Sequence, residues 1–207
     1  PKWPLASNYT GTMVGYPATS VMADVIAKGL VNDANLDKWL EAAVTSSTYQ
    51  PEWLEKVKGT REENVMSKHI YFKEKYGFVP ADSISESVSY GVEMAYYDWC
   101  IAKIAEAAGN QKTADLYFKK AKNYQLYFDE STGFMRGKNS DGSWREPFHP
   151  RFSEHEKSDY VEGNAYQWSY FVPHDISNHI KMHGGKDQFE TQLDTLFTTS
   201  SEIEGEH

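Results

Sequence analysis

The longest apolar pattern in the sequence has the period of an α-helix. Val88, Val92 and Ala95 follow one another at steps of four and three, and Trp99 continues the series. This spacing places the side chains on one face of a helix. Toward its C-terminal end the segment becomes apolar nearly all round, which is typical of a helix surrounded by other elements. We therefore expect a long central helix over residues 82–108.

Shorter helical patterns flank this segment, and several of them come in pairs. Gly77 and Pro80 end one helix, and Pro173 interrupts another. The Asn-Ser-Asp-Gly run at residues 139–142 predicts a turn between two short extended pieces. Paired helices joined by loops indicate an all-α fold, either an α/α toroid or a helical solenoid. The shorter helices are expected over residues 20–30, 35–43, 61–76, 114–124, 164–172 and 187–198.

The composition limits the classes of function. The chain carries a formal net charge of -9, which argues against a nucleic-acid or membrane partner because anionic surfaces are bound by clustered Lys and Arg. No apolar run reaches the roughly 20 residues that span a bilayer. Cys100 is the sole cysteine, so neither an internal disulfide nor a thiolate metal site is expected.

The length of 207 residues fits one domain or a large piece of a larger one. The chain begins without Met and stops after residues 200–207 without a closing element. We therefore expect residues 1–207 to be a single partial domain, and they contain no signal peptide.

One carboxylate stands among aromatic side chains and amides. The surrounding rings are those of Tyr160, Tyr166, Trp168 and Tyr170. Aromatic faces suit sugar rings, and lost hydration raises the pKa of a carboxyl group toward the range of a proton donor. Glu162 is therefore the candidate general acid. The alternative is that Glu162 caps the following helix and the rings form ordinary core.

Five further polar residues are candidates for substrate binding. Gln167, His174 and Asp175 are expected near the acid. His174 and Asp175 follow the break at Pro173, which can turn a side chain into a cleft, although Asp175 could instead cap a helix. Asp98 is costly to bury, so it either has a structural partner or faces a polar cleft. Arg136 could bind a substrate hydroxyl or carboxylate, or form a structural ion pair.

A metal site is not predicted from the histidines. His179 and His183 stand four residues apart and could share a helix face. However, Ile180 takes the place of the Glu found in zinc-peptidase helices, and no third ligand is placed.

Seven short motifs carry a family resemblance. They are Pro-Lys-Trp-Pro-Leu at 1–5, Met-Val-Gly-Tyr-Pro-Ala at 13–18, Glu-Ser-Val-Ser at 86–89, Tyr-Asp-Trp-Cys-Ile-Ala at 97–102, Gly-Phe-Met-Arg-Gly at 133–137, Glu-Gly-Asn-Ala at 162–165 and Phe-Val-Pro-His-Asp at 171–175. Taken together and in order, they resemble glycoside hydrolase family 92, the bacterial exo-acting α-mannosidases, many of which are α-1,2-specific. Each motif alone is weak, but the resemblance runs the full length.

The resemblance implies part of an (α/α)6 toroid, normally preceded by a β-sandwich, that removes α-linked mannose from glycans with inversion and needs calcium. It places the general acid on Glu162, in agreement with the chemical argument. The base carboxylates and the ligands of calcium would lie mainly beyond this chain. The remainder of the same domain is therefore an expected partner, and the isolated chain is expected to be inactive. The implied location is periplasmic or extracellular.

Two other functions stay open at this point. The chain could be a non-catalytic carbohydrate-binding helical module, or part of another α/α-toroid glycosidase that acts on glucosides.

Overall fold

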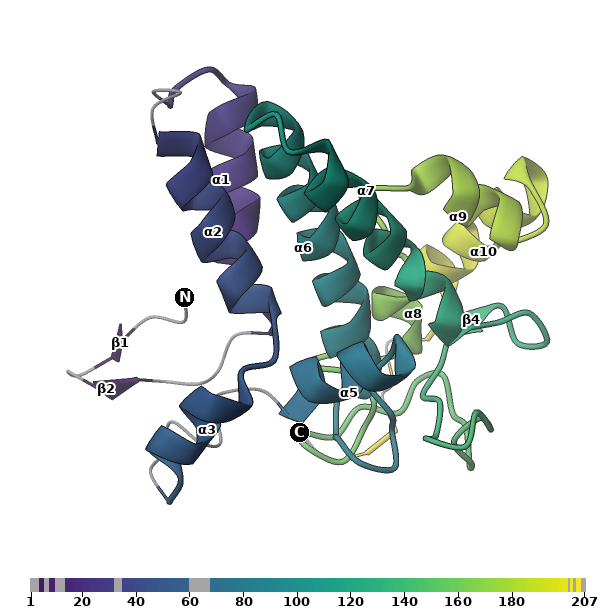
Figure 1. Cartoon of the computed structure of the whole chain (residues 1–207). Helices are drawn as coiled ribbons and strands as arrows, with labels where there is room; N and C mark the ends of the chain where they lie inside the picture. The colour runs from purple at the N-terminus through teal and green to yellow at the C-terminus, as the bar shows by residue number, and fades with distance from the viewer. Residues whose placement is uncertain are drawn as a thin grey trace. The chain divides into compact units, whose positions relative to one another are not determined.

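The structure is a computed structural model that describes residues 14–31, 35–59, 68–200, 202 and 204–205, and the backbone alone at 4–5 and 8–9. Within the described helices, the side chains of residues 53, 54 and 57 are left out. Helices dominate the described part of the chain (Figure 1). They are α1 (Ala18–Ala27), α2 (Leu36–Ser47), α3 (Pro51–Val57), α5 (Lys68–Tyr76), α6 (Ser87–Ala107), α7 (Gln111–Lys120), the 3-10 helix η2 (Ala121–Tyr127), α8 (Ala165–Trp168), α9 (Ile176–Met182) and α10 (Lys186–Thr198).

The strands in the described residues are short and form two antiparallel pairs. β1 (Pro4–Leu5) pairs with β2 (Asn8–Tyr9), and β3 (Phe128–Asp129) pairs with β4 (Phe134–Met135). In the second pair Phe128 lies opposite Met135. The turn predicted at residues 139–142 is present, and it closes the isolated bridge between Lys138 and Trp144.

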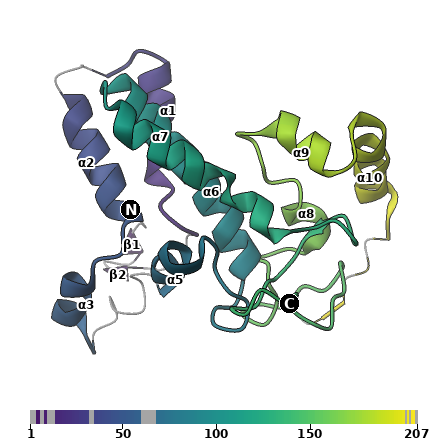
Figure 2. The ribbon, with the colours of Figure 1, turned by 45° about the vertical axis from the view of Figure 1, so that its right-hand side comes forward.

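The chain divides into two compact units. The first unit comprises Pro1–Gly77 and Glu93–Asn123, and the second comprises Phe78–Val92 and Tyr124–His207. In the first unit, α1 and α2 form an antiparallel helical hairpin (Figures 1 and 2). In the second unit, α9 packs against α10.

The long central helix predicted from the apolar pattern is α6, which contributes residues to both units. Val88, Val92 and Ala95 are buried as expected, while Trp99 is half-buried. The helix begins at Ser87, later than the predicted residue 82. The physical reason is Glu86, whose φ of 58° lies in the left-handed region and cannot continue an α-helix.

Other predicted helices differ from the structure at their ends. The segment expected at 114–124 is α7 followed by the tighter helix η2, and the segment expected at 164–172 is only the short helix α8. The start of the helix expected at 61–76 lies outside the described residues, and α5 accounts for its second half.

Asp98 lies in the core of the first unit and pairs with a lysine. Lys73 Nζ lies 2.6 Å from Asp98 Oδ2, and the Tyr16 hydroxyl donates a hydrogen bond to Asp98 Oδ1. Burial lowers the pKa of Lys73 even though Asp98 opposes the shift, and burial with the Asp98 charge raises that of Tyr16 well above its ordinary value. Of the two interpretations of Asp98 from the sequence, a structural partner or a polar cleft, the structure shows the partner.

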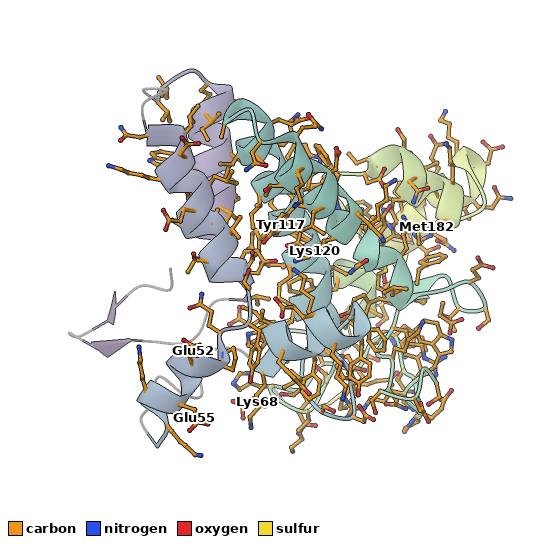
Figure 3. All side chains as sticks on the ribbon, in the orientation of Figure 1. Glu52, Glu55, Lys68, Tyr117, Lys120 and Met182 are labelled. Atoms are coloured by element: carbon orange, nitrogen blue, oxygen red, sulfur yellow. The ribbon has the colours of Figure 1, made fainter. Side chains whose placement is uncertain are left out.

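Tyr117 completes the polar contacts of this core. Its hydroxyl lies 2.6 Å from Ser47 Oγ, which ties α7 to α2. The ammonium of Lys120 lies 4.6 Å from the centre of the Tyr117 ring (Figure 3). Such a cation over an aromatic face is attractive, so the half-buried Lys120 helps to cover a buried ring.

We expect Lys73→Met to destabilise the chain by about 3–5 kcal/mol, because it leaves the Asp98 carboxylate buried without its cation. Urea unfolding followed by circular dichroism measures the change. Lys28→Met is the matched control, since Lys28 forms an exposed pair with Asp24 whose loss should cost about 0–1 kcal/mol. Equal effects of the two variants would contradict the role given to Lys73.

Candidate active site

Glu162 lies in the second unit, three residues before the start of α8. Its φ is 45°, in the left-handed region, and its side chain is exposed. A non-glycine residue in this region costs of order 1–3 kcal/mol and persists only where its surroundings fix the backbone. The conformation of Glu162 is therefore imposed by its neighbours.

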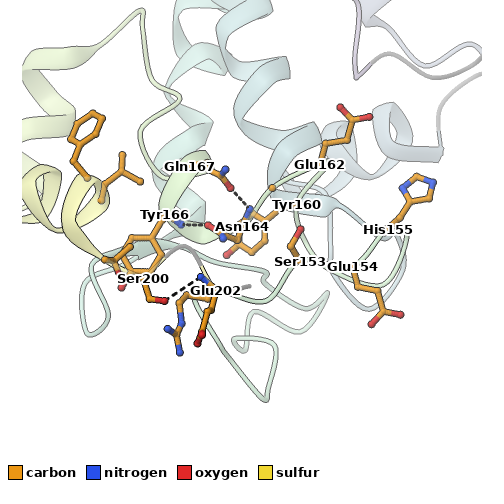
Figure 4. Close-up of a pocket in the computed structure, with 15 residues that line it drawn as sticks. Ser153, Glu154, His155, Tyr160, Glu162, Asn164, Tyr166, Gln167, Ser200 and Glu202 are labelled. Carbon is orange, nitrogen blue, oxygen red and sulfur yellow. Dashed lines mark hydrogen bonds between the residues drawn. The ribbon is translucent and has the colours of Figure 1, made fainter. Parts of the chain in front are cut away.

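The helix after Glu162 is capped by another residue. Asn164 Oδ1 accepts from Tyr166 N at 3.1 Å, and Gln167 Oε1 accepts in return from Asn164 N at 2.8 Å (Figure 4). This capping box satisfies N–H groups at the start of α8. Glu162 does not cap α8, so its carboxylate is not needed there. Gln167, a predicted binding residue, uses its carbonyl oxygen for the cap.

Glu162 and Gln167 line one cavity of about 810 Å³ in the second unit (Figure 4). The wall combines carboxylates, hydroxyls, amides and aromatic rings, the groups that hold a carbohydrate. It also includes Phe197, an exposed ring on α10. The other lining residues are Arg151, Ser153, Glu154, His155, Tyr160, Gly163, Asn164, Tyr166, Leu196, Thr199, Ser200 and Glu202.

The aromatic wall predicted around the carboxylate is only partly present. Tyr160 and Tyr166 line the cavity, but Tyr160 is buried and its hydroxyl donates to Met135 O at 2.7 Å. Trp168 Nε1 donates to a backbone carbonyl, and Tyr170 packs on the ring of His183. The polar atoms of Tyr160 and Trp168 thus find partners inside the unit, whereas Glu162 itself is exposed. The expectation that the rings shield Glu162 from water is therefore wrong for the described residues.

His174 and Asp175 lie away from the wall of this cavity. Asp175 Oδ2 accepts from the Tyr124 hydroxyl at 2.9 Å, and the His174 ring stands edge-on to the Tyr124 ring, with centroids 5.4 Å apart. Asp175 occupies the N-cap position of α9, but its carboxylate is turned to Tyr124 instead of the helix. Neither residue is among the described residues that line the cavity with Glu162.

Arg136 is buried in an ion-pair cluster. Its Nη1 donates to Asp129 Oδ2 at 2.8 Å, and its Nη2 donates to Arg145 O at 2.9 Å and to Glu146. These bonds tie β3 to the loop that follows β4. Arg136 thus forms the structural ion pair that was the alternative to substrate binding. Like Asp98, it is not among the described residues that line the cavity.

Asp159 is a residue of the site region that sequence reasoning missed. Its Oδ1 accepts from Arg145 Nη1 at 3.0 Å and from Ser87 Oγ at 3.2 Å. Burial raises the pKa of Asp159, although Arg145 opposes the shift. A Cβ at Gly137 would lie 2.2 Å from Asp159 Oδ2, so a side chain at this position would displace the carboxylate. The Glu-Ser-Val-Ser motif was the signal that could have pointed to it.

His179 and His183 form a buried pair on α9 and just after it. Their Nε2 atoms lie 3.0 Å apart, and the rings of Tyr170 and Phe189 pack around them. His183 Nδ1 bonds to Gln192 Oε1. Within the described residues, no group of three or more His, Cys, Asp or Glu side chains is placed to hold a metal ion. The described helices also include none long and apolar enough to cross a membrane.

Residues 1–207 match the glycosyl hydrolase family 92 catalytic domain. The chain belongs to glycoside hydrolase family 92. Its fold resembles that of a family 92 α-mannosidase from Bacteroides thetaiotaomicron, with 33% identity, a TM-score of 0.81 and 97% of the chain covered. A family 92 mannosidase of the same organism that is described as inverting gives 30% identity, a TM-score of 0.77 and 92% coverage.

A curated fungal relative extends the family 92 comparison. It is an uncharacterised secreted glycosidase of Arthroderma benhamiae, 26% identical over 89% of the chain. The chain spans about a quarter of the length of these relatives, 24% of each of the two bacterial structures and 26% of the fungal protein. The structural matches confirm the predicted fold class, all-α and part of an (α/α)6 toroid built from helical hairpins.

The histidine pair predicts how the stability of this family 92 chain depends on pH. Burial, aided by His183, lowers the pKa of His179 from 6.5 to about 4. The unfolded chain therefore binds the proton more readily, so stability is full above pH 6.5 and is lost as pH falls toward 4, by about 3 kcal/mol. Urea unfolding between pH 7 and 4 measures this loss.

A flatter pH dependence is expected for His179→Gln. His155→Gln is the control, because the His155 side chain is exposed. If the free energy of unfolding of both variants depends on pH as steeply as that of the unchanged chain, the buried histidine pair does not cause the pH dependence.

Proposed function

We propose that an enzyme carrying this chain removes terminal α-linked mannose from glycans, with Glu162 as the general acid. The observation that carries the proposal is the position of Glu162, exposed on a cavity wall and free of the helix cap that was its competing role. The family and its α-mannosidase structures support the reaction class. A relative was solved with mannoimidazole, which supports a mannose-containing substrate.

The mechanism follows from the geometry that inversion requires. The Glu162 carboxyl would protonate the departing glycosidic oxygen, while a second carboxylate roughly 6.5–9.5 Å away would activate water on the opposite face of the sugar. We propose that this base lies in the part of the catalytic domain that is outside this chain. The relative described as inverting supports this stereochemistry.

The cavity supplies groups for binding the sugar. The ring of Tyr166 packs edge-on against Phe134 with centroids 4.9 Å apart, so it is held rigidly at the wall. A fixed ring can pack on the apolar face of a sugar with little loss of entropy. Gln167 uses its oxygen for the cap, which leaves its Nε2 as the atom to donate to a sugar hydroxyl.

Finer properties belong to the same proposal. We propose α-1,2 linkage, calcium dependence and a bacterial, periplasmic or extracellular enzyme from the family resemblance, and the secreted fungal relative supports work outside the cell. The described residues contain no metal-binding cluster, so they do not fit a calcium site by themselves. The ligands would come mainly from outside this chain.

In an enzyme with the complete catalytic domain, Glu162→Gln should keep the shape and remove the transferable proton. We expect the rate on natural mannosides to fall by about 10²–10⁴-fold. The loss should be much smaller for dinitrophenyl mannoside, whose leaving group needs little protonation. Steady-state kinetics on both substrates measures the difference.

Glu156→Gln is the matched control for this experiment. Glu156 also has a left-handed backbone, with φ of 59°, and an exposed carboxylate in the same loop, but it is not among the described residues that line the cavity. Its substitution should leave both rates within about twofold. A similar loss on both substrates for Glu162→Gln would move the acid elsewhere.

The chain by itself should release no mannose at a measurable rate, because an acid without a base and a water site cannot complete inversion. Assay of the purified chain with aryl mannoside and calcium tests this expectation. Turnover that a chelator abolishes would show that the chain holds a complete site.

A further inference from the structure

The backbone of Val161, the residue before the candidate acid, is held on both sides by side chains. Its N–H donates to Ser89 Oγ at 2.9 Å, and its C=O accepts from Trp168 Nε1 at 2.8 Å. Ser89 lies in the buried first part of α6, and Trp168 lies at the end of α8. Two elements far apart in sequence therefore hold the two peptide groups that flank the Cα of Val161.

The two hydrogen bonds form a clamp on Val161, and the next residue has an unfavourable backbone conformation. Glu162, with φ of 45°, would relax toward the right-handed or extended region if its neighbours released it. Such a rotation would move the carboxylate of Glu162. The hydrogen bonds at Val161 fix the direction in which the chain enters Glu162, so they bear on where the carboxylate lies.

Gly163 fixes the other side of the acid. A Cβ at this position would lie 2.8 Å from Gln167 Oε1 and 3.2 Å from Trp168 Nε1. The first distance is too short for any real Cβ contact, so a side chain here would displace the cap or the indole. The absence of a side chain at Gly163 therefore lets the Trp168 indole approach and reach the carbonyl of Val161.

We propose that Ser89 and Trp168 are positioning residues for the general acid. This inference rests on the proposed function of Glu162. A general acid must come within about 2.6–3.2 Å of the oxygen that it protonates, and a misplacement of about 1 Å can cost 10²-fold in rate. The Glu162 side chain is exposed, so the described contacts that bear on its reach are those of the backbone at Val161.

The test uses Ser89→Ala and Trp168→Phe in an enzyme with the complete catalytic domain. Each variant removes one hydrogen bond to Val161, and the second keeps an aromatic ring. We expect kcat on a mannoside with a poor leaving group, such as a disaccharide, to fall by about 10–10²-fold. On dinitrophenyl mannoside, which needs little protonation, kcat should fall by less than about threefold.

Ser169→Ala is the matched control. Ser169 is buried in the same unit, and its Oγ accepts from the backbone N–H of Met135 at 2.8 Å, so the variant removes the same kind of bond away from Val161. It should show no dependence on the leaving group. Circular dichroism and unfolding curves establish that each variant is folded, and Trp168→Phe still tests the inference if Ser89→Ala does not fold.

The outcomes separate this inference from the proposed function. If Glu162→Gln shows the leaving-group dependence but Ser89→Ala and Trp168→Phe slow both substrates equally or not at all, the clamp is only structural and the inference is overturned. If Glu162→Gln itself lacks that dependence, the acid role fails first. If all three variants lose kcat selectively on the substrate with the poor leaving group, the result supports both the acid role of Glu162 and the positioning role of Ser89 and Trp168.

Discussion

The first turn of α6 and the loop before α8 hold each other in place, and the candidate site depends on this contact. The first N–H groups of a helix have no partner within the helix. Those of Val88 and Ser89 donate to the carbonyl of Asp159 at 3.0 and 3.4 Å, and the Ser87 hydroxyl donates to the Asp159 carboxylate. The loop that carries Glu162 therefore completes the N-terminus of the longest helix.

This exchange explains features that lie apart in the sequence. The left-handed Glu86 ends the turn before α6 and donates its own N–H to Ser158 O at 2.8 Å, so the helix begins where the loop meets it. Gly137 leaves space for the Asp159 carboxylate. A site on a loop would otherwise move with the loop, but here the loop is fixed by a buried helix.

The sequence predicted the apolar framework better than the roles of polar residues. The spacing of Val88, Val92 and Ala95 identified α6, because helical periodicity is local information. The partner of Asp98 is Lys73, which lies 25 residues earlier, so only the folded chain could show that this carboxylate is paired. A costly buried charge can be recognised in a sequence, but its partner cannot.

The identity of the candidate acid was accessible from the sequence, whereas its environment was not. Glu162 was chosen for its aromatic neighbours, yet the indole of Trp168 contributes through its N–H, by holding Val161. An aromatic ring that is near a carboxylate in sequence can face inward and bond to the backbone. Side chains in a loop do not alternate between inside and outside with a fixed period, so the sequence does not reveal this orientation. Glu162 therefore combines a backbone fixed from inside the unit with a side chain open to the cavity, the arrangement that lets a proton donor be aimed while it still meets its substrate.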